Sequence, residues 1–283
     1  MYFVVSAVFH YLGPAFAVLL FARLDVLGVA WLRIAAAALV FALWRRPWRL
    51  PGWWRWRDLL AWGAVLAAMN SVFYLALERL PLGTVAAIEF LPVIVLAAFA
   101  ARTGRNLLAL ALAVTGVYLL TDVHLVAAPL GPACAAANAV LFAAYIVLGD
   151  RVAKDATLSG LDGLAVAMLI AAVLALPVGI ADAAPAFTDP LLLAAAAGVG
   201  VSSSVIPYVT DQLALARLPR ATYALMVSLL PATATVIGVI VLTQIPGPAE
   251  ILGVVLVVGG VALHAPAARR NPERTPLTEA RPG

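Results

Sequence analysis

The sequence has little charge. Asp, Glu, Lys and Arg make up 11% of its 283 residues, whereas 65% are hydrophobic, and the mean hydropathy is +1.05. A soluble domain carries charge on about a quarter of its residues, and one soluble core could not cover this much apolar side chain. The composition therefore excludes a soluble globular protein and indicates a chain that lies largely in lipid.

Cysteine and histidine are also scarce. The single Cys134 cannot form an intrachain disulfide, and we interpret it as a small packing residue. His10, His124 and His264 are scattered and no His-Glu-x-x-His signature occurs, so we expect no metal site and no cofactor. No basic leader precedes the first apolar segment, so we expect that segment to be retained rather than cleaved.

What the sequence contains instead is about ten apolar runs. A helix needs about 20 apolar residues to cross roughly 30 Å of hydrocarbon. The period-2 alternation of a membrane β-barrel is absent. We therefore predict an all-α integral membrane protein with ten transmembrane helices, because helices satisfy the backbone in lipid. The predicted helices are residues 2–22, 26–44, 59–77, 84–101, 106–121, 131–149, 160–181, 191–215, 221–243 and 250–265.

A short motif occurs twice in the chain. LALERLP at 75–81 returns as LALARLP at 213–219, and each copy leads into an apolar stretch with a proline. Five predicted spans separate the copies, an odd number, so equivalent segments should have opposite orientations in the bilayer. We therefore predict two inverted five-helix repeats, residues 1–122 and 130–265, followed by a disordered cytoplasmic tail at 266–283.

Basic residues fall mainly on one side of the predicted bundle. Of the eighteen Lys and Arg residues, fifteen lie in the connections after even-numbered helices or in the tail, and the others are Arg23, Arg33 and Arg79. Cytoplasmic loops retain positive charge, so both termini are predicted to be cytoplasmic. We interpret WRRPWRLPGWWRWR at 44–57 as an anchor at the lipid headgroups, not as a nucleic-acid patch.

Several motifs resemble a known family. They are Trp31-Leu32-Arg33, ALERLPLGTVAAIEFLPVIVLA at 76–97 and ALARLPRATYALMVSLLPATATVIG at 214–238. Together they are similar to the EamA family of the drug/metabolite transporter superfamily, over about residues 6–265. The resemblance implies a bacterial inner-membrane exporter driven by an ion gradient, with protons as the expected ion and amino acids such as threonine or homoserine as the expected cargo. Export of another small metabolite or a drug is the alternative.

Few polar side chains lie within the predicted spans. Arg33, Asn70 and Glu89 each lie about 7–10 Å below the outer ends of their helices, at 1.5 Å per residue. Ionisable groups at such depths are functional candidates. Arg33 and Glu89 could bind the carboxylate and the ammonium of an amino acid, with Asn70 as donor and acceptor. Glu89 is also the predicted proton-coupling group. Alternatively, Arg33 and Glu89 pair with each other, or Glu89 faces lipid headgroups.

Helical spacing adds further candidates. Polar residues four or seven positions apart share a helix face, and such faces are expected to point into the bundle. Asp211 is a second proton-coupling candidate, with a solvated interfacial position as its alternative. His10 is a candidate for the cavity wall, with a packing role as its alternative. We predict substrate contact, with structural hydrogen bonding between helices as the alternative, for Tyr74, Asn138, Tyr145 and Tyr208.

Prolines interrupt four of the predicted helices, at Pro14, Pro92, Pro207 and Pro231. A proline inside a helix frees a carbonyl and bends the axis. Pro92 and Pro231 occupy equivalent places in the two repeats. They are therefore candidate hinges for the rocking of each half, with fixed kinks as the alternative.

Two other classes of function have weaker support. The sequence Gly-Val-Ser-Ser at 200–203 faintly resembles the nucleophile turn of intramembrane serine proteases, but its last glycine is replaced and no histidine is suitably placed. A passive channel would need a ring of like polar groups or a filter sequence, and neither occurs. We therefore predict a transporter of a small molecule and not an enzyme. Small residues such as those at 194–200 leave a homodimer open.

Overall fold

The computed structural model describes residues 2–49, 56–92, 95, 103–127, 129–153, 159–215 and 230–263. The side chains of residues 2–4, 49, 121–127, 153 and 211–215 lie outside this description. Within the described ranges the chain forms helices and turns and contains no strand. This agrees with the predicted all-α protein.

Five of the described helical segments are long and apolar enough to cross a membrane, by length and composition. Four further helices are apolar over shorter described stretches. The long segments are α2 (Val26–Arg45), α3 (Trp56–Leu77), α7 (Leu130–Ala153), α8 (Gly160–Gly179), and α10 (Pro190–Gly200) with its continuation through η3 (Val201–Val205) and α11 (Ile206–Leu215). The shorter ones are α1 (Tyr2–Leu20), α6 (Gly104–Ala127), α13 (Leu230–Leu242) and α14 (Pro248–Leu263). The remaining described helices are η1 (Pro47–Arg49), α4 (Leu82–Glu89) and α9 (Ala184–Thr188).

The observed helices differ from the predicted ones in three places. The span predicted at 191–215 is not one α-helix, because the π-helical turn η3 separates α10 from α11. The span predicted at 84–101 has its first helix end at Glu89, followed by a turn at Phe90, and most of its remainder lies outside the described residues. The helix α9 was not predicted. It begins with Pro185 in its first turn and ends before Asp189, which caps α10. Residues 221–229 and the predicted tail also lie outside the described part.

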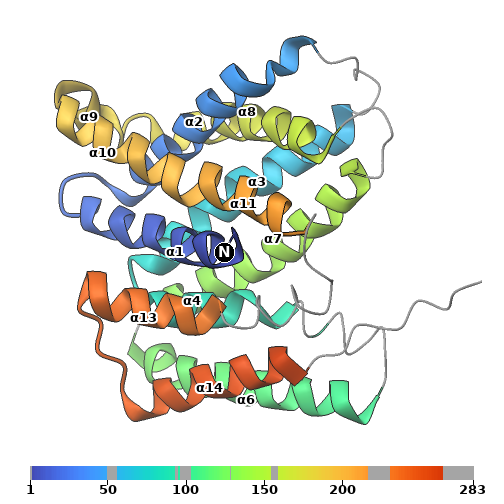
Figure 1. Ribbon diagram of the computed structural model, residues 1–283. Helices are drawn as coiled ribbons and strands as arrows, with labels where there is room; N and C mark the ends of the chain where they lie inside the picture. The colour runs from blue at the N-terminus through green and yellow to red at the C-terminus, as the bar shows by residue number, and fades with distance from the viewer. Residues whose placement is uncertain are drawn as a thin grey trace, which may run out of the picture.

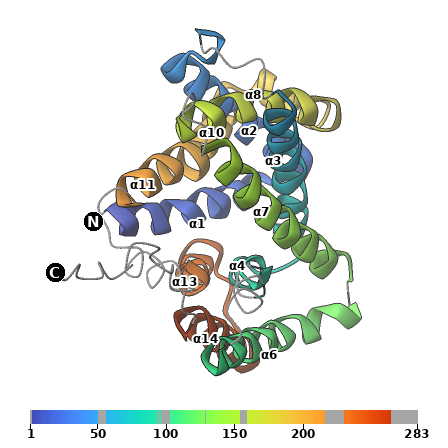
Figure 2. The same ribbon diagram turned by 90° about the vertical axis from the view of Figure 1, so that its right-hand side faces the viewer.

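The helices form one bundle, in which α6 packs against α14 at one side and α2 packs against α8 at the other (Figures 1 and 2). Between them, α3 contacts α7 and α8, α1 contacts α11 and α13, α4 contacts α7 and α13, and α2 contacts α10. The α1–α2 turn, α9 and the α13–α14 connection lie at the same end of the bundle, at the left of Figure 1. The middle of the molecule is therefore enclosed by helices from both ends of the sequence.

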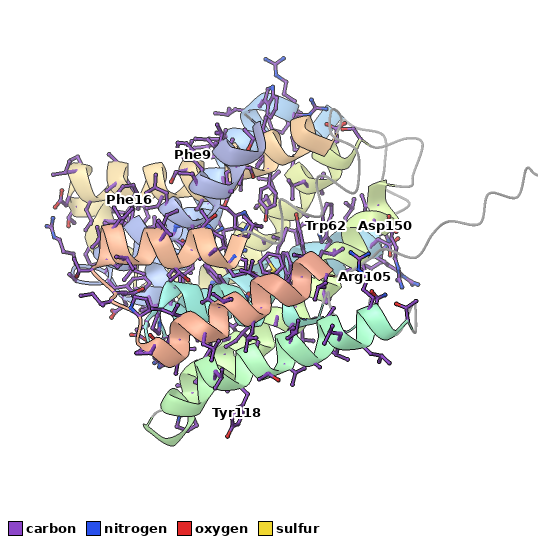
Figure 3. The ribbon with its side chains drawn as sticks, turned by 60° about the horizontal axis from the view of Figure 1, so that its bottom comes forward. Phe9, Phe16, Trp62, Arg105, Tyr118 and Asp150 are labelled. Atoms are coloured by element: carbon purple, nitrogen blue, oxygen red, sulfur yellow. The ribbon has the colours of Figure 1, made fainter. Side chains whose placement is uncertain are left out.

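The outer surface of the bundle is apolar. Tyr118, labelled in Figure 3, projects from α6 away from the other helices and is 58% exposed. Such a surface suits hydrocarbon rather than water, since lipid tails are as apolar as leucine. Other exposed apolar side chains on the described helices include Leu39, Leu43, Val140, Val173, Leu191, Ile240 and Val255.

Ion pairs connect both ends of α2 to the second half of the chain. At one end, the Arg45 guanidinium lies 2.7 Å from the Asp162 carboxylate, in the first turn of α8. At the other, Arg23 lies 2.8 Å from Asp189, which also accepts the backbone N–H groups of Leu192 and Leu191. The Leu192 hydrogen bond is the main cause that lowers the pKa of the Asp189 carboxyl. Asp189 is therefore held as an anion at the start of α10.

Glycines allow the closest helix contacts. A Cβ added to Gly253 of α14 would lie 2.8 Å from the Gly116 carbonyl oxygen and 2.7 Å from the Leu120 Cγ of α6. The same addition at Gly259, also on α14, would meet no atom within 4 Å. The α6–α14 contact therefore depends on Gly253 and not on Gly259.

We expect Gly253→Ala to lower the melting temperature of the purified protein in detergent. Pushing two helix backbones apart costs about 1–3 kcal/mol, which corresponds to a fall of several degrees. Gly259→Ala is the matched control and should leave the melting temperature unchanged or slightly raised, since alanine favours helix. Equal melting temperatures for the two variants would show that the α6–α14 contact is looser than described.

Candidate functional site

A cavity of about 480 Å³, counting its part open to solvent, lies in the middle of the bundle. Its walls come from α1, α2, α3, α4, α7, η3 and α11. The lining residues are His10, Pro14, Arg33, Met69, Asn70, Phe73, Glu89, Asn138, Phe142, Tyr145, Ser203 and Tyr208.

The structure brings six of the eight predicted site residues to this cavity, namely Arg33, Asn70, Glu89, Asn138, Tyr145 and Tyr208. Tyr74 is fully buried and does not line the cavity, but its ring centroid lies 5.3 Å from the Arg33 Cζ. Asp211 belongs to α11, and its side chain lies outside the described part of the structure. His10, the further candidate, does line the cavity.

Arg33 is held by the π-helical turn. Its side chain comes from the middle of α2 and the residue is 9% exposed. Its Nε donates to the Ser204 hydroxyl at 3.2 Å, and its Nη2 donates to the Ser203 carbonyl at 3.2 Å. With the Tyr74 ring beneath it, the guanidinium has polar and aromatic partners on several sides. The two hydrogen bonds use two of the five N–H donors of Arg33, and the residue also lines the cavity.

Glu89 is held by α7. It is the last residue of α4 and is 6% exposed. Its Oε1 accepts a hydrogen bond of 3.1 Å from the Asn138 Nδ2. The Asn138 Oδ1 is buried and has no hydrogen-bond partner. An acceptor of this kind beside a cavity is a place where a donor from a bound molecule can be satisfied.

The predicted alternative that Arg33 and Glu89 pair with each other is wrong for this structure. Both side chains are described, and they form no ion pair within 4.0 Å. Each is satisfied separately, Arg33 by η3 and Glu89 by α7. The alternative that Glu89 faces lipid headgroups is also wrong, because the residue is buried at the cavity wall. The cavity therefore presents a guanidinium and a carboxyl group that are not joined in an ion pair.

Asn70 points its amide back along its own helix. Its Nδ2 donates to the Leu66 carbonyl at 2.8 Å, one turn earlier on α3. A hydrogen bond within its own helix therefore accounts for one of its two donor hydrogens. Because Asn70 also lines the cavity, its carbonyl oxygen remains a candidate acceptor for a bound molecule.

Aromatic side chains form another part of the wall. The Tyr145 ring centroid lies 5.6 Å from that of Trp62, 6.3 Å from that of Phe142 and 6.2 Å from that of Tyr208. Phe142 in turn contacts Phe90, directly after Glu89, at 6.2 Å. Aromatic faces of this kind attract ammonium groups.

Some lining residues were missed by the sequence reasoning. Phe142 lies four residues after Asn138 and three before Tyr145, so the helical spacing that identified those two also indicates Phe142. Ser203 was considered only as part of a protease-like turn. Its carbonyl contributes to the site, and a backbone group has no residue-type signal in the sequence.

The serine-protease alternative fits the geometry poorly. Ser202 and Ser203 both donate their hydroxyl hydrogens to the Val199 carbonyl, at 3.2 and 2.6 Å. A serine nucleophile needs a base that accepts this hydrogen.

In the described residues, no group of three or more His, Cys, Asp and Glu side chains could hold a metal ion. The arrangement instead suits reversible binding of a small molecule that carries both charges.

Comparisons with known proteins identify the family of this chain. Residues 129–265 match the EamA-like transporter family. The chain is 31% identical to the threonine/homoserine exporter RhtA of Salmonella typhimurium (strain LT2) over 269 residues, which are 92% of this chain and 89% of that protein. It is 32% identical to RhtA of Escherichia coli (strain K12) over 245 residues, which are 85% of this chain and 82% of that protein.

The fold is also found among solved structures. One crystal structure superposes with a TM-score of 0.61 over 93% of this chain and 96% of its own, at 20% sequence identity. That agreement concerns the fold alone. The identity to the RhtA proteins extends over most of both chains, and it places this protein among transporters rather than enzymes. The chain belongs to the EamA-like transporter family.

Proposed function

We propose that this protein exports small zwitterionic amino acids, such as threonine and homoserine, across the bacterial inner membrane by proton-coupled alternating access. The observation that carries the proposal is that buried Arg33 and Glu89 line one cavity without pairing with each other. The similarity to the RhtA exporters supports the choice of cargo.

The cavity chemistry matches an amino acid. A guanidinium binds a carboxylate through two parallel hydrogen bonds, which makes Arg33 the partner for the carboxylate of the cargo. Glu89 is the partner for the ammonium, with the Asn138 Oδ1 as a second acceptor. The aromatic wall of Tyr145 and Tyr208 borders the same space.

Helix packing supports the proposed inverted repeats. In this scheme α1, α2, α3, α4 and α6 of residues 1–122 correspond in order to α7, α8, α10–η3–α11, α13 and α14 of residues 130–265. If each helix is replaced by its counterpart, the α3–α7 contact corresponds to α11–α1, the α3–α8 contact to α10–α2, and the α1–α13 contact to α7–α4. Both contacts of each pair are observed. The α2–α8, α4–α13 and α6–α14 contacts map onto themselves. Ten spans with this two-fold exchange are the architecture that we propose.

The same scheme gives a transport cycle. The cavity is lined by helices of both proposed repeats, so a rocking of one repeat against the other would open it to alternate sides. Pro92 and Pro231 remain the proposed hinges. We propose one chain as the transport unit, with a homodimer as the alternative. Both termini are proposed to be cytoplasmic, which places Arg23 and Asp189 at the outer face.

Glu89 is the proposed site of proton coupling. A carboxylate can bind either a proton or the ammonium of the cargo, but a protonated carboxyl no longer attracts that ammonium. A proton that arrives from the outer face would therefore release the amino acid outward. The protonated site would then turn inward and exchange its proton for the next amino acid. Asp211 remains a second proposed proton site.

We expect Glu89→Gln to abolish uphill threonine export from proteoliposomes with an imposed proton gradient. The amide cannot exchange a proton or neutralise an ammonium, so both the coupling and the binding are lost. The matched control is Glu78→Gln, because Glu78 lies at the end of α3, is partly exposed and pairs with Arg79 away from the cavity. Gradient-driven export that persists in Glu89→Gln would exclude Glu89 as the coupling group.

We expect Arg33→Lys to raise the half-saturating concentration for threonine roughly tenfold or more, because a lysine cannot bind a carboxylate bidentately. The measurement is initial-rate efflux against the internal threonine concentration. Arg105→Lys is a control, since Arg105 is exposed at the start of α6 and donates to the Leu263 carbonyl. An unchanged half-saturating concentration in Arg33→Lys would show that Arg33 does not contact the carboxylate.

A further inference from the structure

Pro207 cannot donate the backbone hydrogen bond that a carbonyl of its own helix would otherwise accept. In an α-helix the N–H of residue 207 would donate to the carbonyl of residue 203, four positions earlier. Proline has no N–H, and its ring clashes with that carbonyl. The chain responds with the wide turn η3, in which the Ile206 N–H donates to the Val201 carbonyl, five residues earlier. The Ser203 carbonyl is thus available to another donor.

Arg33 donates a hydrogen bond to this carbonyl, and it does so through one particular edge of its guanidinium. The Ser204 hydroxyl and the Ser203 carbonyl bind Nε and Nη2, which form the side edge of the guanidinium. Neither hydrogen bond uses Nη1, and Arg33 lines the cavity, so we assign the end edge, formed by Nη1 and Nη2, to a ligand. A planar fork of two N–H groups is the arrangement that matches a carboxylate.

Two glycines bring η3 close enough for this contact. A Cβ added to Gly200 would lie 2.7 Å from the Arg33 carbonyl oxygen on α2. One added to Gly13 of α1 would lie 2.7 Å from the Ser203 nitrogen. The turn is therefore wedged between α1 and α2, and the Ser203 carbonyl is fixed beside the guanidinium.

We propose that Pro207 is a positioning residue for substrate selectivity. Pro207 is buried and does not line the cavity. Because Pro207 has no N–H to donate to the Ser203 carbonyl, that carbonyl can accept a hydrogen bond from Arg33 and fix the side edge of the guanidinium. The end edge of the guanidinium then selects cargo with a carboxylate. The selectivity for a carboxylate rests on the function proposed above, whereas the coupling between Pro207 and Arg33 does not.

The coupling is tested by a double-mutant cycle on the melting temperature of the full chain in detergent. Pro207→Ala restores the N–H and lets the Ser203 carbonyl return to the helix. Arg33→Met should therefore lower the melting temperature less in the Pro207→Ala background than in the wild type, by roughly 2 °C or more. Arg33→Lys replaces Arg33→Met if the latter does not fold. Pro177→Ala is the matched control, an exposed proline inside α8, and it should be additive with Arg33→Met.

The selectivity is tested by competition of threonine and threonine amide for efflux. The amide keeps the ammonium but lacks the carboxylate. We expect the preference for threonine to fall roughly tenfold in Pro207→Ala, the loss of about one hydrogen bond to a charged group, and to be unchanged in Pro177→Ala.

The outcomes separate the two proposals. Additive effects of Pro207→Ala and Arg33→Met on the melting temperature would overturn the positioning role, whatever the cargo is. Coupled effects with an unchanged preference for threonine would overturn its part in selectivity. Wild-type protein that moves no threonine would overturn the proposed function, while the melting temperatures would still decide whether Pro207 positions Arg33.

Discussion

A guanidinium and a carboxylate inside a membrane protein each need polar partners, because an unsatisfied charge in hydrocarbon is expensive. Here the two charged side chains do not form an ion pair with each other. Arg33 is satisfied by the backbone and a hydroxyl of η3, and Glu89 by the amide of Asn138. Each charge thus keeps part of its binding capacity, and both face one cavity. That division is how a bundle with so few charged residues would offer the proposed site for a zwitterion.

The fold supplies these partners through close contacts between helices from distant parts of the chain. Gly200 and Gly13 let η3 lie against α2 and α1, so a serine carbonyl reaches Arg33. The α4–α7 contact places Asn138 beside Glu89. If the helices form the two inverted repeats that we propose, the cavity lies between the two halves. Under the proposed alternating access, the site would then lie at the interface that moves.

Sequence reasoning identified the membrane class, the helical spans and most of the cavity residues because each depends on local pattern. Depth along a helix selected Arg33 and Glu89, and spacing selected Asn138 and Tyr145. The partners of these residues could not be found in the same way, since Arg33 binds a carbonyl 170 positions away. The π-helical turn was also missed, although Pro207 was recognised as an interruption, because a proline can end, kink or widen a helix and tertiary packing decides which.

The most direct test of a site that holds both charges of its cargo is calorimetric titration of the purified wild-type protein with three ligands. Threonine carries both charges, threoninol lacks the carboxylate, and 2,3-dihydroxybutyrate lacks the ammonium. If Arg33 and Glu89 each bind one charge of the cargo, threonine should bind at least roughly tenfold more tightly than either analogue. Each analogue would leave one of these buried groups without its counter-charge. Equal binding of threonine and one analogue would show that the corresponding charge, on Arg33 or on Glu89, takes no part in recognition.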